Sequence, residues 1–367
     1  MKLSCTQENL VRGVNAVGHL TGKNLSLPIL SNILLRAEQG SVTLASTNLE
    51  VGITKKIRAK VEREGTYTIQ GRVFLEFINL LPKEQVDIEV VDGALHIAAG
   101  KHESIIKGIP ADEFPVIPNI NKEKRVAIKA GVLREALQQT IFAAANDESR
   151  PEISGIYFVF ENGILTVAAT DSYRLAERRV VLDEGKDVVH KTILPVKTLS
   201  EILRILGDTS EMVEIFLEEN QFGIVVDDLE LVSRVIEGQY PDYQQIIPQE
   251  STTTATFGRQ EFLNNVKAAS LFVKPGINDL TIELNPESKK ILFRAANTQV
   301  GEQSGEIESE MTGRGVELVF NYRYLLDGLT NFQSDTITLL ANDQKNPGLF
   351  TESDKGDYRY LVMPIRQ

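Results

Sequence analysis

The segment Ala168–Leu175, with the sequence AATDSYRL, concentrates side chains of the kinds from which active sites are built. Between Thr170 and Leu175 it holds one carboxylate, three hydroxyl groups and a guanidinium. A carboxylate beside hydroxyl groups can act as a general base that activates a nucleophile, and a guanidinium can stabilise a developing anion. Such chemistry needs a base, a nucleophile and an orienting group that other parts of the chain hold in place.

The rest of the sequence offers few partners for that chemistry. The four histidines are scattered, and neither an HExxH motif nor a cysteine pair accompanies them: His19, His96, His102 and His190. The GxSxG, P-loop and dinucleotide-binding motifs are missing, and Cys5 is the single cysteine. We therefore predict a protein without catalytic activity, metal or cofactor, in a reducing compartment.

Three segments of the chain align without gaps and share one pattern of apolar and charged residues. They are IQGRVFLEFINLL (69–81), LPVKTLSEILRIL (194–206) and FNYRYLLDGLTNF (320–332), at offsets of 125 and 126 residues. In each, a basic residue precedes an acidic residue by four positions, as in Arg72 and Glu76. One such pair supports an exposed helix face, and three at nearly equal spacing predict a repeated strand and short amphipathic helix.

The AATDSYRL segment belongs to a repeat as well. LASTN (44–48), VAATD (167–171) and RAANT (294–298) each end a run that alternates like a half-buried strand. Helical patterns open the three units at 6–20, 131–145 and 259–273. We predict three domains, residues 1–121, 122–249 and 250–367, with polar linkers near 117–125 and 247–254. Two helices and many strands in each domain indicate an α+β fold with antiparallel sheets.

The charge is distributed unevenly along the chain. The net charge is −12, which by itself argues against nucleic acid as a partner. The six predicted helical segments nevertheless carry eleven basic and six acidic residues, so the strands and loops are strongly acidic. If the helices face one way, they form a mildly positive surface that attracts phosphates weakly and without sequence preference.

Nothing in the sequence indicates a membrane protein. The first ten residues, MKLSCTQENL, lack an apolar signal core, and the apolar run LPILSNILL (27–35) is too short and too polar to span a bilayer. We expect a cytoplasmic protein with no membrane partner.

Several of these segments together resemble one known family. LPILSNILL (27–35), ATDSYRLA (169–176), YPDYQQIIP (240–248) and the final YLVMPIRQ (360–367) are similar to segments of the bacterial DNA polymerase III beta subunits, the sliding clamps. The resemblance extends over all 367 residues. It implies a head-to-tail homodimer whose six similar domains close a ring, with the helices lining the hole. Double-stranded DNA then passes through the ring, which slides on it and tethers the polymerase for processivity.

The resemblance also assigns a role to the AATDSYRL segment. In the family this segment walls a pocket between the second and third domains, where the replicative polymerase, the clamp loader and repair proteins insert short peptide motifs. Asp171 is then a turn residue and not a base. The expected floor comprises Leu175, Ile246, Val362 and Met363, and Arg174 and Arg366 are expected at the rim. The implied pocket residues are Ile153, Thr170, Ser172, Tyr173, Arg174, Leu175, Pro241, Ile246, Asn321, Tyr324, Val362, Met363, Pro364 and Arg366.

Two further surfaces follow from the same resemblance. In the dimer interface, an edge strand near Lys101–Ile109 is expected to meet Leu271 and Phe272 of the third domain. The residues expected to face DNA are Lys23, Arg72, Arg150, Lys197, Arg204 and Lys267.

This chain departs from the family at two places. It has Ser172-Tyr173 where some members have Gly-His, and Gln244-Gln245 where some have basic residues. These differences concern the polar rim of the pocket and not its apolar floor.

Two alternatives remain open at this stage. One is an enzyme with a site between domains, which a triad of acid, base and nucleophile would favour. The other is a repeat-built protein scaffold that does not act on DNA, which an even distribution of charge would favour.

Overall fold

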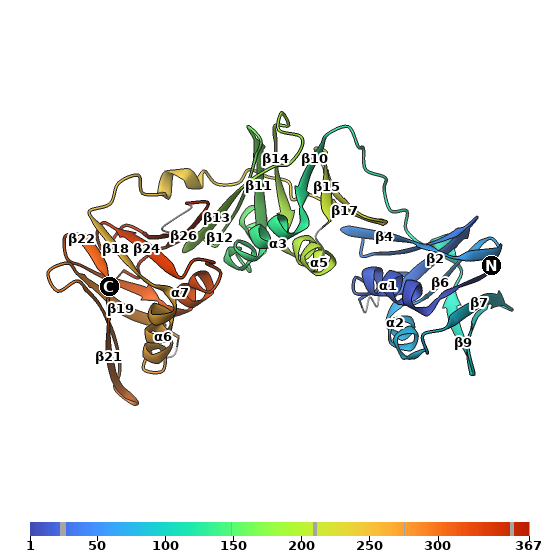
Figure 1. Ribbon diagram of the computed structural model, residues 1–367, viewed down its shortest axis with the longest axis horizontal. Coiled ribbons are helices and arrows are strands. Elements are labelled where there is room, and N and C mark those ends of the chain that lie inside the picture. Colours follow the sequence, from blue (N-terminus) through green and yellow to red (C-terminus); the bar gives the residue numbers. More distant parts are fainter. Residues whose placement is uncertain (23–26, 148, 208–210, 275, 353–355, 367) are drawn as a thin grey trace. The chain divides into compact units, whose positions relative to one another are not determined.

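The computed structural model describes the chain except for residues 23–26, 148, 208–210, 275, 353–355 and 367, and it forms two compact units. The first unit comprises residues 1–130, 183–185 and 200–235, and the second comprises 131–182, 186–199 and 236–367. Figure 1 shows that each unit consists of helices packed on sheets. Lys23 lies outside the described residues.

The sheet of the first unit is antiparallel and continuous. It holds thirteen strands among the described residues, and the four strands at one end of its order come from the second sequence repeat. From one edge to the other the strands are β10 (Arg125–Lys129), β15 (Met212–Leu217), β16 (Gln221–Val226), β17 (Leu229–Arg234), β4 (Val51–Arg58), β3 (Ser41–Thr47), β2 (Asn32–Glu38), β6 (Gly65–Gln70), β9 (His102–Ile109), β8 (Ala94–Ala99), β7 (Gln85–Val91), β1 (Lys2–Thr6) and β5 (Lys60–Arg63).

The second unit contains two antiparallel sheets. The larger has the order β14 (His190–Pro195), β11 (Gly155–Glu161), β12 (Ile164–Thr170), β13 (Arg174–Val181), β26 (Tyr358–Val362), β25 (Gly348–Glu352), β24 (Thr336–Ala341), β18 (Thr253–Gly258) and β22 (Glu310–Gly313). The smaller has the order β21 (Gly301–Glu308), β20 (Lys290–Asn297), β19 (Asp279–Asn285) and β23 (Val316–Asn321).

The helices are short and few, as the sequence predicts. The described helices are α1 (Gln7–Gly18), α2 (Gly71–Leu80), α3 (Ala130–Gln138), α4 (Pro151–Ser154), α5 (Val196–Leu206), α6 (Arg259–Ser270) and α7 (Tyr322–Leu329). Single 3₁₀ turns lie at η1 (Pro28–Ser31), η2 (Ala111–Glu113), η3 (Ile141–Ala143) and η4 (Tyr243–Ile246).

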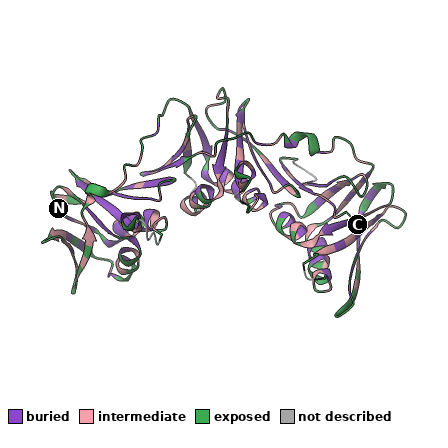
Figure 2. Cartoon of the chain, turned by 180° about the vertical axis from the view of Figure 1, so that it is seen from behind, coloured by how far each residue is buried: buried purple, intermediate pink, exposed green. Residues whose placement is uncertain are grey.

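The predicted sequence repeat coincides with repeated structure. The three aligned segments form α2, α5 and α7, each directly after a strand. Each helix buries one apolar stripe at helical spacing, such as Phe74 and Ile78 in α2 and Leu325 and Leu329 in α7. The buried residues in Figure 2 accordingly gather where helices meet sheets. Helix α1 packs beside α2, and α6 packs beside α7.

The first helix of each repeat is shorter than predicted. Helix α1 ends at Gly18, α6 ends at Ser270, and α3 ends at Gln138 before the separate 3₁₀ turn at 141–143. In the last case the Thr140 hydroxyl donates to the Ala136 carbonyl at 2.7 Å and competes with continuation of the helix. Lys274 consequently lies outside a helix, and so does Lys83, because the second helix α2 ends at Leu80.

Two long segments without strands connect the repeats. The first linker, residues 110–124, runs from β9 to β10, and the second linker, residues 235–252, runs from β17 to β18. Both begin earlier than predicted and therefore include the aromatic–proline pairs Phe114-Pro115 and Tyr240-Pro241. In each unit a strand pair joins neighbouring repeats: β17 pairs with β4, and β13 pairs with β26.

Candidate functional site

The polar side chains of the AATDSYRL segment close the turn between β12 and β13. The Asp171 carboxylate accepts the backbone N–H groups of Tyr173 and Arg174, both at 2.9 Å. The Thr170 hydroxyl donates to the Arg174 carbonyl at 2.6 Å and accepts the Ser172 N–H at 3.1 Å. These bonds make an Asx turn with Ser172 at a φ of 78°. Asp171 is thus a turn residue, as the family resemblance implies, and these contacts give it no role as a base.

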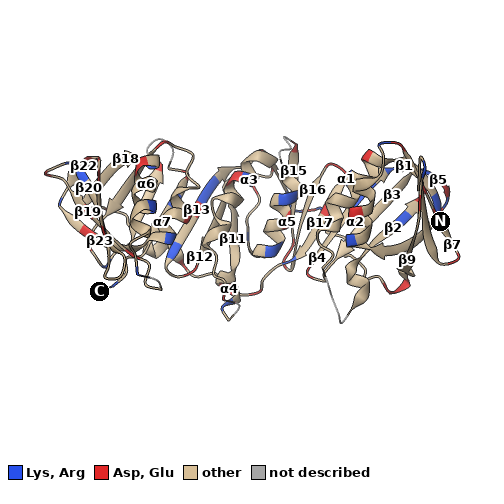
Figure 3. Ribbon diagram, turned by 90° about the horizontal axis from the view of Figure 1, so that it is seen from below, with Lys and Arg blue, Asp and Glu red and all other residues tan. Residues whose placement is uncertain are grey.

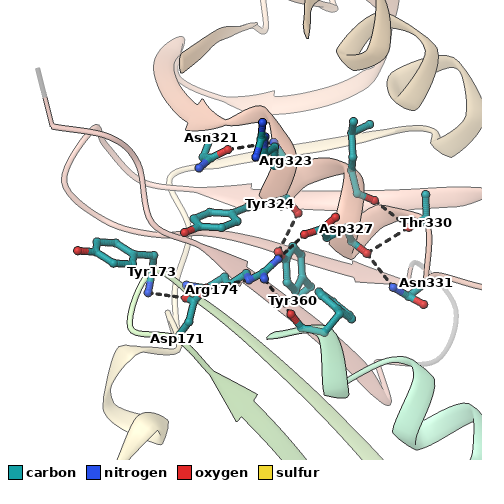
Figure 4. A network of polar contacts seen from close by, with 12 residues as sticks. Asp171, Tyr173, Arg174, Asn321, Arg323, Tyr324, Asp327, Thr330, Asn331 and Tyr360 are labelled. Atoms are coloured by element: carbon teal, nitrogen blue, oxygen red, sulfur yellow. Dashed lines mark hydrogen bonds and ion pairs between the residues drawn. The ribbon is translucent and has the colours of Figure 1, made fainter. Parts of the chain in front are cut away.

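Arg174 is the centre of a larger polar network (Figure 4). Its Nε pairs with Asp171 at 3.0 Å, its Nη1 with Asp327 of α7 at 2.7 Å, and its Nη2 donates to the Phe142 carbonyl at 2.8 Å. The guanidinium also lies 4.6 Å from the ring centroid of Tyr324. One planar cation therefore connects the β12–β13 turn, η3 and α7 with charge-assisted bonds.

The residue beneath this network is a buried tyrosine. The Tyr360 hydroxyl donates to the Tyr324 carbonyl at 2.8 Å, and its side chain lies inside unit two. Burial raises the pKa of Tyr360, so that the hydroxyl remains a hydrogen-bond donor.

These contacts correct one expectation. The Arg174 side chain is only 10% exposed, and each guanidinium nitrogen has a protein partner. Arg174 therefore lies below the rim where the family resemblance places it. Arg366 is exposed and stays a candidate rim residue. The sequence gives no sign of this difference, because Phe142 and Asp327 are 32 and 153 residues away along the chain.

The predicted floor also lies deeper than expected. Leu175 and Val362 are fully buried, and Ile153, Thr170 and Pro364 are buried as well. The accessible apolar residues are Tyr173, which is 63% exposed, and Ile246, which is 46% exposed. Half-buried side chains complete the predicted set: Pro241, Asn321, Tyr324 and Met363. Among the predicted floor residues, Ile246 and Met363 are thus accessible, whereas Leu175 and Val362 are not.

The C-terminal segment lies against the same turn. Val362 is the register partner of Arg174 in the β13–β26 pair, and the Met363 N–H donates to the Tyr173 carbonyl at 2.8 Å. Further on, the Ile365 N–H donates to the Val319 carbonyl at 2.7 Å. Residues 363–365 belong to no helix or strand. Hydrogen bonds to two different segments hold them in place.

Asn321 and Arg150 take structural roles that the sequence did not indicate. The Asn321 side chain caps α7 by accepting the Arg323 N–H at 3.0 Å. Arg150 donates to the Ser172 hydroxyl at 2.9 Å and lies 3.5 Å from a Glu152 carboxylate oxygen. Arg150 is therefore part of the surroundings of the β12–β13 turn.

The other residues expected to face DNA divide into two groups. Arg72, Lys197 and Lys267 are exposed on α2, α5 and α6, and Arg72 pairs with Glu76 at 2.9 Å. Arg204 differs, because it pairs with Glu201 and donates to the Asn15 and Ala16 carbonyls at 3.0 and 2.6 Å. This guanidinium fixes α5 to the end of α1, and three of its five N–H groups are used in these bonds.

The positive charge of the helices is smaller than predicted. Within the bounds of the six repeated helices there are eight basic and six acidic residues, because the helices end before Lys83 and Lys274 and because Lys23 is not described. In Figure 3 the Lys and Arg positions on α5 are separate segments of the ribbon, with other residues between them.

Exposed apolar residues mark the surfaces expected at a dimer interface. Leu271 is 72% exposed and Phe272 is half-buried just after α6. In the first unit, β9 pairs with β8 from His102 to Lys107 but with β6 only at Gly108 and Ile109, so one edge of β9 is open. Ile105 on this strand is 65% exposed.

Helix α2 has a second apolar stripe that was not among the residues predicted from the sequence. Val73 is 42% and Leu80 is 82% exposed, and Phe77 lies between them at helical spacing. This stripe is adjacent to the buried stripe of Phe74 and Ile78. A helix that is apolar on more than its core face is the signal that could have revealed it.

Within the described residues, no cluster of three or more histidine, cysteine, aspartate or glutamate side chains is arranged to bind a metal ion. Cys5 is buried and unpaired, and burial raises the pKa of its thiol to about 12. None of the described helices is long and apolar enough to cross a membrane.

Comparison with known proteins gives matches along the whole chain. Models of the N-terminal, central and C-terminal domains of the DNA polymerase III beta subunit match residues 1–118, 127–242 and 244–366. The beta sliding clamps of Bacillus subtilis and Synechococcus elongatus are each 28% identical to it and are covered over 100% and 99% of their lengths, with 100% of this chain.

Solved structures agree with the sequence matches. The DNA polymerase sliding clamp from Bacillus subtilis superposes with a TM-score of 0.96 at 28% identity, covering 100% of this chain and 99% of that one. A sliding clamp from Pseudomonas aeruginosa bound to griselimycin superposes with a TM-score of 0.95 at 25% identity, covering 100% of both chains.

Proposed function

Because this chain belongs to the DNA polymerase III beta subunit family, the bacterial beta sliding clamps, we propose that it is a processivity factor that encircles duplex DNA and tethers the replicative polymerase. The observation that carries this function is the match of three clamp domain models, in order, to nearly the whole chain. The alternative, a scaffold that does not act on DNA, has no such observation in its favour. We place the domains at 1–121, 122–249 and 250–367 and the protein in the cytoplasm.

The protein performs this function without chemistry of its own. The candidate base Asp171 is held by two N–H groups and Arg174 within a turn, and its neighbour Thr170 donates to a backbone carbonyl. In these bonds neither side chain is paired with a nucleophile or an orienting histidine. The polar residues of the AATDSYRL segment therefore support a binding surface.

We assign partner docking to the surface around the β12–β13 turn. The exposed Tyr173 and Ile246 and the half-buried Met363 offer apolar contacts to a short peptide, and a thioether adapts to different anchors. Arg366, Gln244 and Gln245 supply polar groups at the edge. Burying two apolar anchors contributes about 3–6 kcal/mol before ordering costs, which alone corresponds to a dissociation constant between millimolar and tens of micromolar, so polar contacts at the edge must supply the rest of a tighter affinity. The polymerase, the clamp loader and repair proteins would dock through such peptides.

The contact with DNA is weak and shared among separate cations. Arg72, Arg150, Lys197 and Lys267 remain candidates because they are exposed, whereas Arg204 is a weaker candidate because it bonds to Glu201 and to two carbonyls of α1. Few and separate phosphate contacts suit a protein that must slide, because each contact adds to the affinity and to its salt dependence. Retention on DNA then comes from topology, which requires a closed ring.

A head-to-tail homodimer closes that ring in our proposal. The open edge of β9 with Ile105, together with the α2 stripe of Val73 and Leu80, meets Leu271 and Phe272 of a second copy. Exposed apolar residues on both surfaces provide the association energy, and a heterologous interface that closes yields a ring.

Size measurement and peptide titration test the two assignments separately. Replacing Leu271 and Phe272 with lysine should convert a dimer of the full chain to a folded monomer in sedimentation equilibrium. Removing residues 363–367 should abolish binding of a peptide with Gln, Leu and a C-terminal Phe while the dimer persists. A monomeric wild-type chain would contradict the ring, and undiminished peptide binding after truncation would contradict the docking site.

A further inference from the structure

The two linkers cross equivalent parts of the structure. Beneath the first linker, a row of register partners runs across β2, β3, β4 and β17: Leu34, Ala45, Thr54 and Glu230. Beneath the second linker, the corresponding row runs across β11, β12, β13 and β26: Tyr157, Ala168, Glu177 and Arg359. The first three positions of the rows differ by a constant 123 residues, so the repeat relates one row to the other.

The second linker fills the space above its row with tyrosines. Tyr240 stacks on Tyr157 with ring centroids 4.6 Å apart and an interplanar angle of 3°. Tyr243 meets Tyr240 edge to face at 6.3 Å and donates its hydroxyl to the buried carboxylate of Glu177 at 2.7 Å. Tyr240, Tyr243 and Ala168 belong to one buried hydrophobic cluster, and Tyr157 packs against it.

The first linker has smaller residues at the matching positions. Phe114 stands where the second repeat has Tyr240, Ile117 where it has Tyr243, Leu34 where it has Tyr157, and Thr54 where it has Glu177. Ile117 is directed to Gly52, where an added Cβ would lie 2.6 Å from its Cγ2 atom, and so it does not fill the space above the row. Two rings and one carboxyl group are therefore missing at this place.

A cavity of about 390 Å³ occupies the space between the first linker and the sheet. Phe114, Ile117 and Val232 give it apolar contacts, Ala45 lies at its base, and threonine hydroxyls are present on three strands: Thr43, Thr54 and Thr66. The lining also includes the charged residues Arg36, Asp112 and Glu230. The volume is within the range of small-molecule sites, and apolar contacts beside hydroxyl and charged groups suit a ligand with an apolar body and a polar group that forms hydrogen bonds.

We propose that this cavity is a binding site for a small monocyclic phenol. At the equivalent place beneath the second linker, phenol rings of the protein itself fill the space. Tyr157 and Tyr240 stack on each other, and the Tyr243 hydroxyl bonds to Glu177. In the first unit a free ring can stack on Phe114 as Tyr157 stacks on Tyr240, and its hydroxyl can bond with a threonine of the wall. This site is separate from the surface around the β12–β13 turn and does not depend on the proposed function.

The test uses p-cresol as the probe and the full chain, with toluene as the matched compound that lacks the hydroxyl. Titration followed by the methyl signals of Ile117 and Thr54 should saturate with a dissociation constant on the order of 1 mM. Toluene should bind roughly threefold to tenfold more weakly, because it lacks one hydrogen bond. Ala45→Leu, which fills the base of the cavity, should abolish the shifts and retain the unfolding midpoint of the wild type.

A second variant guards against misfolding of the first. Thr54→Met projects into the cavity from β4, and it should block p-cresol in the same way. The proposal is wrong if p-cresol produces no saturable shift, or if both folded variants bind it as well as the wild type. It is also wrong if toluene binds as tightly as p-cresol, because the hydroxyl then contributes nothing to binding.

Discussion

The turns at Thr47–Val51 and Thr170–Arg174 have the same backbone and different side chains. In both, a threonine hydroxyl accepts the N–H two residues later, from Leu49 at 3.0 Å and from Ser172 at 3.1 Å. Both of these residues adopt positive φ, 76° for Leu49 and 78° for Ser172. The threonine hydroxyl then donates to the carbonyl four residues later, at 2.8 Å in the first turn and 2.6 Å in the second.

The second residue of each turn has the same function as well. Asn48 accepts the N–H groups of Glu50 and Val51 at 3.0 and 2.8 Å. Asp171 accepts the two corresponding N–H groups, both at 2.9 Å. In the first turn an amide oxygen therefore accepts the same two N–H groups that a carboxylate oxygen accepts in the second turn.

The difference lies in the residue that ends each turn. Arg174 joins three segments of the second unit, whereas Val51 at the same place is a buried apolar side chain of β4. The threonine and the Asx residue thus build the turn, and the arginine adds the connection to α7. This is why the AATDSYRL segment resembles an active site without being one.

The largest expected effect comes from making the second turn like the first. Arg174→Val removes three charge-assisted hydrogen bonds and leaves the carboxylate of Asp171 in a mostly buried position without a cation. We expect a loss of about 3 kcal/mol in the free energy of unfolding, measured by urea denaturation. Arg174→Lys, which keeps the charge without the planar fork, should lose less. An unchanged free energy in Arg174→Val would show that the network adds nothing to stability.

Packing beneath the two linkers should differ at one equivalent pair of alanines. Ala168 is fully buried in the tyrosine cluster, whereas Ala45 borders the cavity. Ala168→Leu should therefore cost about 2 kcal/mol through overpacking, and Ala45→Leu should cost nothing measurable. The comparison of the two linkers fails if both variants lose the same free energy of unfolding.

A smaller effect is expected when the carboxylate of the second turn becomes an amide. Asp171→Asn keeps the acceptor for both N–H groups, as Asn48 does, but loses the ion pair with Arg174. We expect a loss of about 1 kcal/mol, and the matched Asn48→Asp variant should be nearly neutral. Thermal unfolding of both variants checks this, and a loss as large as that of Arg174→Val would mean that the turn itself had failed.

The smallest effect concerns the ion pair at the β4–β17 junction. Lys55, which is buried, donates to Asp227 at 3.2 Å, and this hydrogen bond lowers the pKa of Asp227 below its usual value. A carboxyl group with a lowered folded pKa contributes stability above its unfolded pKa and loses it as the pH falls through the folded value. The difference in unfolding free energy between the wild type and Asp227→Asn should therefore be constant above the ordinary pKa of a carboxyl group, about 4, and shrink as the pH falls below it. A difference that stays constant from pH 7 to pH 3 would contradict this.

The repeats and the turn could be predicted from the sequence because both depend on local patterns. The apolar and charged spacing of residues 69–81 is sufficient to indicate α2, and Thr170 and Asp171 are typical turn residues. The position of Arg174 could not be predicted, because its partners are distant in the chain. The helix ends and the buried state of Leu175 and Val362 also depend on tertiary packing, which residue types alone do not determine.

The most direct test of the central claim is the lifetime of the loaded protein on circular and linear DNA. If the protein is a closed ring that holds DNA by topology, it should remain on a nicked circle in about 0.5 M salt, where exposed phosphate contacts are largely screened. Cutting the circle once should release it as it slides off the ends. Equal and rapid loss from the intact circle at this salt concentration would contradict the account.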